Sequence, residues 1–143
     1  MSTDKSFVRM TLLGAIATAF WVTGPHAFAA ESPTMLTGER EVPPVVTTAT
    51  ATSDIVVGTD MHVSGGVTTT GIEATAAHIH VGAPGVSGPV AVTLTKTQPG
   101  HWSVPDGTKL TAAQYDSFKA GNLYINVHSA EHAAGEIRAQ LKP

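Results

Sequence analysis

The sequence has no cysteine, little charge and few aromatic residues. Of its 143 residues, 13 % are charged and 6 % are aromatic. The lack of cysteine excludes disulfides and thiolate metal sites, so any metal ligands must be His, Met, Asp or Glu. A net charge of −3, with 8 scattered Lys and Arg, argues against nucleic-acid binding. No nucleophile-elbow, phosphate-loop or HExxH motif occurs, so we do not expect an enzyme.

The first 29 residues show the three parts of a secretory signal peptide. Lys5 and Arg9 precede an uncharged run at residues 10–22, and small residues stand at Ala27 and Ala29. The apolar run is shorter than the roughly 20 residues that cross a bilayer. We therefore expect cleavage after Ala29, no membrane span in the mature chain, and a periplasmic or secreted protein.

The remaining chain predicts one all-β domain with a single short helix. Segments rich in Val, Ile and Thr are separated by Gly, Pro and Asp about every ten residues, which is typical of a β-sandwich or barrel. The helix is expected near residues 112–119, with Thr111 as its N-cap and Gly121 just after its end. The expected strands are residues 49–57, 61–67, 74–81, 89–94, 102–104, 123–128 and 136–141. On the last strand, Glu136, Arg138 and Gln140 are expected to share a solvated face.

Histidine is the residue type that most needs an explanation. His78 and His80 flank Ile79 on a predicted strand, so both rings share the face opposite Ile79. Their Cα atoms should lie about 6.5 to 7 Å apart. Metal–nitrogen bonds of about 2.0 to 2.1 Å then allow both rings to reach one ion. If the strand at residues 123–128 is the neighbour, His128 completes a three-histidine set.

Two further histidines are candidates for a fourth ligand. His62 lies on the face of its predicted strand that points away from the core, and His132 follows His128 by four residues in a predicted turn. Imidazole ligands suit copper, zinc or nickel, and copper(II) binds nitrogen ligands most tightly among the divalent ions. We therefore expect copper, with zinc as the second choice. The alternative is that these histidines are solvated or bonded to turn carbonyls.

Six motifs resemble the CHRD domain, a family named for repeats in chordin and also found as single secreted bacterial domains. The resemblance spans residues 36–141 and implies an exported β-sandwich of immunoglobulin-like, Greek-key character. We therefore expect a mobile lead at residues 30–35 and a CHRD-like domain at residues 36–143. The family pattern also contains the histidines that match His78, His80 and His128. The motifs are LTG with EVPPV at residues 36–45, AHIH at 77–80, GPV at 88–90, LT at 110–111 with Tyr115, GNLYINVH at 121–128, and GEIR with QL at 135–141.

Two functions follow from these patterns. The first is an exported metal-binding protein that stores, delivers or sequesters copper through a histidine cluster on its strands. The second is a metal-free extracellular module that binds another protein or a polymer through sheet edges and the loop at residues 82–88. A metal ion is the expected partner in the first case and another exported molecule in the second.

Overall fold

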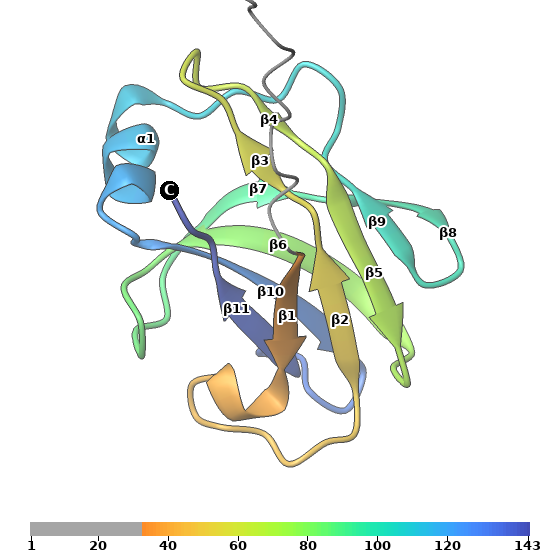
Figure 1. Ribbon diagram of the computed structural model, residues 1–143. Coiled ribbons are helices and arrows are strands. Elements are labelled where there is room, and N and C mark those ends of the chain that lie inside the picture. Colours follow the sequence, from red (N-terminus) through yellow and green to blue (C-terminus); the bar gives the residue numbers. More distant parts are fainter. Residues whose placement is uncertain (1–32) are drawn as a thin grey trace, which may run out of the picture. The chain divides into compact units, whose positions relative to one another are not determined.

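The computed structural model describes residues 33–143 (Figure 1). The signal peptide predicted at residues 1–29 lies outside the described residues, as do residues 30–32 of the predicted lead. Within the described part, no helix has both the length and the apolar character needed to cross a bilayer.

The described chain is all-β with one short α-helix, which confirms the predicted fold class. The helix α1 (Ala112–Lys119) begins with a capping box in which Thr111 and Gln114 each bond the other's backbone N–H. A short 3-10 helix, η1, covers Gly38–Arg40. The strands are β1 (Thr34–Thr37), β2 (Thr50–Ser53), β3 (Val56–Val57), β4 (Val63–Ser64), β5 (Gly66–Thr70), β6 (Ala74–Val81), β7 (Val90–Thr93), β8 (Thr95–Gln98), β9 (His101–Ser103), β10 (Leu123–Ser129) and β11 (Ile137–Gln140).

Nine of the strands form one antiparallel sheet that curls nearly into a barrel. Their order is β7-β6-β10-β11-β1-β2-β5-β9-β8, and β3 and β4 form a separate hairpin. The two edge strands, β7 and β8, are separated in the chain by Leu94 alone. One residue spans at most about 3.6 Å, so a flat sheet could not place its two edges so close. The sheet therefore bends until its edges approach each other.

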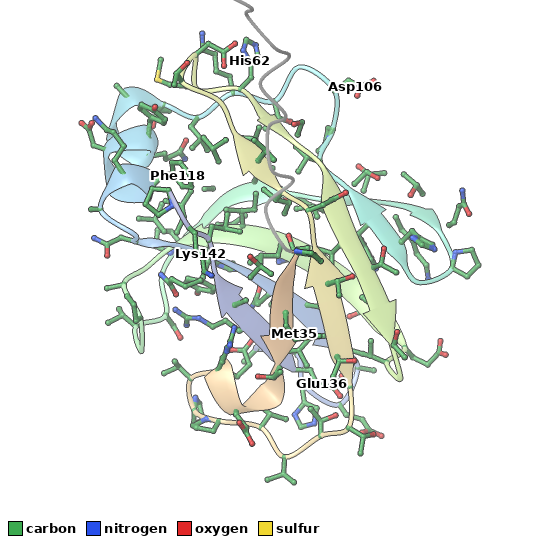
Figure 2. The ribbon with its side chains drawn as sticks, viewed as in Figure 1. Met35, His62, Asp106, Phe118, Glu136 and Lys142 are labelled. Carbon is green, nitrogen blue, oxygen red and sulfur yellow. The ribbon has the colours of Figure 1, made fainter. Side chains whose placement is uncertain are left out.

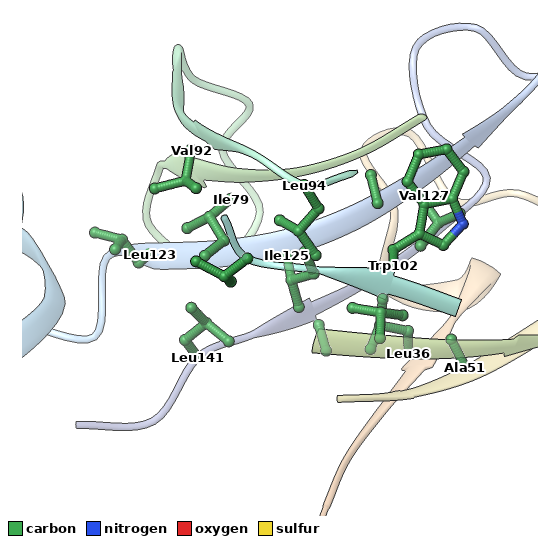
Figure 3. Packing of buried hydrophobic residues seen from close by; sticks show 14 of the residues in the cluster. Leu36, Ala51, Ile79, Val92, Leu94, Trp102, Leu123, Ile125, Val127 and Leu141 are labelled. Carbon is green, nitrogen blue, oxygen red and sulfur yellow. The ribbon is translucent and has the colours of Figure 1, made fainter. Parts of the chain in front are cut away.

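The curled sheet encloses the hydrophobic core on its inner face. Leu36, Ile79, Ile125 and Ile137 have no exposed surface, although they come from four different strands. Figure 3 shows Trp102 of β9 packed with side chains from the opposite half of the sheet. The helix adds Phe118 to this core. The alternation predicted from the sequence thus places one side of each central strand inside.

Local structure differs from the sequence prediction in β8, which was not predicted, and in the strand predicted at residues 61–67, which is divided between β4 and β5. It also differs in two further places. The lead at residues 30–35 was expected to be mobile, but Thr34 and Met35 belong to β1 because they pair with Ser53 and Thr52 of β2. The predicted strand at residues 49–57 is divided, since the Asp54 side chain accepts a hydrogen bond from the Gly66 N–H at 2.7 Å. These last two differences come from contacts between residues that are distant in the sequence.

Truncation of a core residue should measure how much this packing contributes. Ile125→Ala removes a fully buried side chain from β10. We expect the free energy of unfolding to fall by about 2 to 5 kcal/mol, measured by urea denaturation. Val46→Ala is the control, because Val46 is fully exposed. An equal loss in both variants would contradict the assigned core.

Candidate metal centre

The structure brings His78, His80 and His128 together on one face of two paired strands. His78 and His80 come from β6, and His128 comes from the antiparallel neighbour β10. In this register His78 lies opposite Asn126, two residues from His128. Side chains two residues apart share a face of a strand, so the three rings lie on the same side of the sheet. The strand pairing on which the sequence prediction depended is therefore present.

The three imidazoles are close enough to share one ion. Each offers a ring nitrogen, and these nitrogens all lie within 4.8 Å of one another. The closest pair is His78 Nδ1 and His128 Nε2, which are 2.9 Å apart. Within residues 33–143, no other group of three His, Asp or Glu side chains converges in this way. The group thus offers three neutral nitrogen ligands and no carboxylate ligand.

Backbone carbonyls orient two of the three rings. His80 Nδ1 lies 2.9 Å from the carbonyl oxygen of Gly88, and His128 Nδ1 lies 3.0 Å from that of Ala133. Since a carbonyl only accepts, each Nδ1 carries the proton and each Nε2 keeps its lone pair. Both Nε2 atoms are potential ligands, as in known metal sites where outer hydrogen bonds orient the ring. The His128 Nε2 accepts a hydrogen bond from the His78 Nδ1–H, which an ion bound by both rings would replace. The His80 Nε2 has no protein partner.

The His80 ring is also held by a stack of two side chains, those of Tyr124 and Arg138. The Tyr124 ring is parallel to the His80 ring, with centroids 4.8 Å apart and an interplanar angle of 4°. The Arg138 guanidinium carbon lies 3.4 Å from the centroid of the Tyr124 ring. The Tyr124 hydroxyl also accepts a hydrogen bond from the Gly88 N–H, at 3.1 Å. Gly88 therefore contacts both His80 and Tyr124 and ties their positions together.

The loop at residues 82–88 reaches His80 because residue 88 is a glycine. A Cβ atom at Gly88 would collide with the carbonyl group of Val81. Without a side chain, the loop returns close to β6, and the Val81 N–H donates to the Pro89 carbonyl at 2.9 Å. The glycine thus permits the contact that orients the ring.

Burial and mutual repulsion favour the neutral form of the cluster. The pKa of His78 is lowered from 6.5, first by desolvation and then by the nearby His128 and His80. Desolvation also lowers the pKa of His128, against an opposing hydrogen bond to Ala133. Metals bind only the neutral ring, so the site is ready for a ligand at neutral pH.

The other two predicted ligands lie outside the cluster. His62 is exposed in the β3–β4 hairpin, where its Nδ1 lies 2.9 Å from Asp60. Figure 2 places His62 at the opposite end of the domain from Glu136, which is bonded to β10 beside His128. His132 lies in the turn after β10, where its backbone N–H donates to the Ser129 hydroxyl. Neither residue belongs to the group of converging ring nitrogens, so a fourth ligand from His62 or His132 stays a prediction.

The sequence prediction missed the buried polar layer around the histidines. Glu136, Arg138 and Gln140 were expected on a solvated face, but Glu136 is 8 % exposed, Arg138 is 1 % exposed and Gln140 is partly buried. Every residue of β10 is likewise buried, on both faces of the strand. The loops at residues 82–88 and 130–136 account for this, since Arg138 donates to the Ala83 and Val86 carbonyls. The only sign in the sequence that Arg138 is buried was the low charge content of the chain, which makes a charged residue on a central strand unusual.

Comparison with known proteins supports the family resemblance. The family model described as the CHRD domain matches residues 33–141. No curated protein and no solved structure gives a match.

The lowered histidine pKa values predict how stability depends on pH in the metal-free protein. An unfolded histidine titrates near 6.5, whereas His78 and His128 titrate lower in the folded chain. The unfolded state therefore binds more protons as the pH falls below about 6.5, and the free energy of unfolding decreases. We expect His78→Gln to flatten this decrease in urea denaturation with a chelator present. The exposed His101→Gln should not, and an unchanged slope in His78→Gln would contradict the assignment.

Proposed function

The chain belongs to the CHRD domain family, and we propose that it is an exported protein that binds a transition metal ion through His78, His80 and His128. The observation that carries this proposal is the orientation of the rings. Two of them use Nδ1 to bond backbone carbonyls, and one ring nitrogen of each of the three histidines lies within 4.8 Å of the others. Histidines that only bonded loop carbonyls would not need to bring their ring nitrogens so close together.

Copper is the ion that suits the donor set best, with zinc as the second choice. The three donors are neutral imidazole nitrogens, and no carboxylate joins them within the described residues. Calcium and magnesium need oxygen ligands, which this group does not offer. Among the divalent ions, copper(II) has the highest affinity for nitrogen sites. The same three ligands are also compatible with zinc.

We infer that the site holds and releases an ion rather than catalysing a reaction, because no carboxylate that could act as an acid or base joins the three histidines within the described residues. His80 and His128 are each 8 % exposed, whereas His78 is half-buried and is the most exposed of the three. Three protein ligands leave room for a further ligand from water or from a donor or acceptor molecule. We therefore propose storage, delivery or sequestration of copper, with no enzymatic activity.

A metal-free binding module is the second candidate, and one observation favours it. Val86 in the loop at residues 82–88 and Val90 in the edge strand β7 are 52 % and 49 % exposed. Two neighbouring exposed valines beside an unpaired strand edge could contact another exported protein through strand addition. This function does not require the histidines to bind a metal.

Export predicts a defined N-terminus in the mature protein. The proposal rests on the charge, length and small-residue pattern of residues 1–29. We expect intact mass and N-terminal sequencing of the protein from the periplasm or medium to show a chain that begins at Ala30. Retention of residues 1–29 in the membrane fraction would contradict cleavage.

Metal binding predicts a rise in thermal stability that depends on the cluster. A ligand that binds only the folded state stabilises it by about 2.7 kcal/mol at about 100 times its Kd. We expect copper(II) to raise the Tm and to titrate with one site in calorimetry. The His78→Ala variant should weaken binding at least about tenfold, since even the loss of an outer contact costs that much. His78→Ala combined with His80→Ala should abolish it.

The control for this experiment is His101→Ala, an exposed histidine on β9 that should leave copper binding intact. Circular dichroism of each variant distinguishes lost binding from lost folding. Copper binding should also weaken in acid, because protons compete for the imidazoles. Equal copper affinity in the wild type and the folded double variant would overturn histidine ligation and leave the binding-module proposal in its place.

A further inference from the structure

A cleft opens beside strands β1 and β11. It has a volume of about 740 Å³ and is lined by residues from β1, η1, the segment after η1, the loop at residues 82–88, and the end of the chain after β11. Figure 2 shows Met35 and Lys142, which both line it, on neighbouring segments of the domain. We call this cleft the β1–β11 cleft. Its size is that of a cleft for a small organic molecule.

Cations outnumber carboxylates among the residues that line the β1–β11 cleft. Three of the six Lys and Arg within residues 33–143 line it: Arg40, Arg138 and Lys142. The ion pairs of the described residues are those of His62 with Asp60 and Lys119 with Asp116, so none involves the cleft. Glu39 and Glu41 also line the cleft, but neither lies within ion-pair distance of these cations. The cleft therefore has three cations against two carboxylates, and none of the three cations is held in an ion pair.

Arg138 is the most deeply buried of these three cations, and burial is unusual for a charged side chain. It is 1 % exposed, and its Nη2 donates to the Ala83 and Val86 carbonyls, while its Nη1 has no protein partner. A buried charge is costly unless an opposite charge compensates it. The nearest acidic candidate is Glu41, which attracts the guanidinium without forming an ion pair with it; burial raises the pKa of Glu41 and lowers that of Arg138. Arg138 thus supplies a fixed positive potential at the inner wall.

The remaining walls of the cleft are largely apolar. Met35, Val42, Pro44 and Pro84 line it, and Met35 is 47 % exposed. A site for an inorganic anion would not need such walls, whereas a hydrocarbon group would bury surface against them. Apolar walls with a few charged groups are typical of sites for small organic ligands.

We propose that the β1–β11 cleft binds a small organic carboxylate, with the carboxylate held by Arg40, Lys142 and the field of Arg138 and the hydrocarbon part against Met35 and Val42. Arg40 and Lys142 are exposed, and although Arg40 Nη1 donates to the Met35 carbonyl at 2.9 Å, the other N–H groups of both side chains remain for the ligand. Carboxylate is the anion that fits a guanidinium fork, and the apolar walls select a ligand that carries a hydrocarbon chain.

This inference does not depend on metal binding. The Arg138–Tyr124–His80 stack connects the two sites, but the proposed carboxylate contacts no histidine. Binding is therefore measured with a chelator present, and the folded His78→Ala variant, whose changed side chain is not part of this stack, should bind the carboxylate as the wild type does. The two proposals can fail separately.

The test is titration of the isotope-labelled protein with octanoate, followed by amide NMR, with octanamide and sulfate as comparison ligands. We expect octanoate to shift resonances of residues that line the cleft and to bind more tightly than either comparison ligand. Arg40→Gln and Lys142→Gln should each weaken octanoate binding by about two- to fivefold, the factor for a partly exposed ion pair. Raising the salt concentration should weaken it further.

Lys109→Gln is the matched control, because it removes one positive charge from an exposed lysine outside the cleft. Equal binding of octanamide would show that charge is not recognised, and equal binding of sulfate would show that the apolar walls are not used. Shifts confined to other parts of the protein, or an equal effect of Lys109→Gln, would likewise overturn the proposal.

Discussion

The pairing of β6 with β10 is the interaction on which the rest of the structure depends. Its register places Ile79 opposite Ile125 on the core side, and His78 opposite Asn126 on the other side. A shift by one residue would exchange the two faces, burying the histidines in the core and exposing the isoleucines. The apolar face therefore fixes the geometry of the polar one, because the burial of Ile79 and Ile125 is what holds the register.

The second face of β10 is buried as well, and this requires a connected set of polar contacts. Asn126 is paired with His78 on β6 and with Arg138 on β11, so one polar row crosses three neighbouring strands. Loops cover this row and supply carbonyl groups to His80, His128 and Arg138. Buried polar groups are tolerated when such partners are present. The covering loops are thus part of the histidine site rather than connections beside it.

Arg138 links the two places where we propose ligands. On one side it packs against Tyr124, which packs against His80, and on the other it lines the β1–β11 cleft. An arginine suits this position because its planar group can stack on an aromatic ring while its N–H groups bond carbonyls.

The sequence by itself determined the all-β class, the bounds of β6 and α1, and the face on which His78, His80 and His128 lie, because these follow from local periodicity and capping. Tertiary structure decided what local patterns do not encode. It made β10 the neighbour of β6, left His62 and His132 outside the cluster, and placed Thr34 in a strand. It also covered Arg138 with a distant loop. Which strands meet, and what covers their outer faces, depends on packing between residues that are far apart in the chain, and no local pattern carries that information.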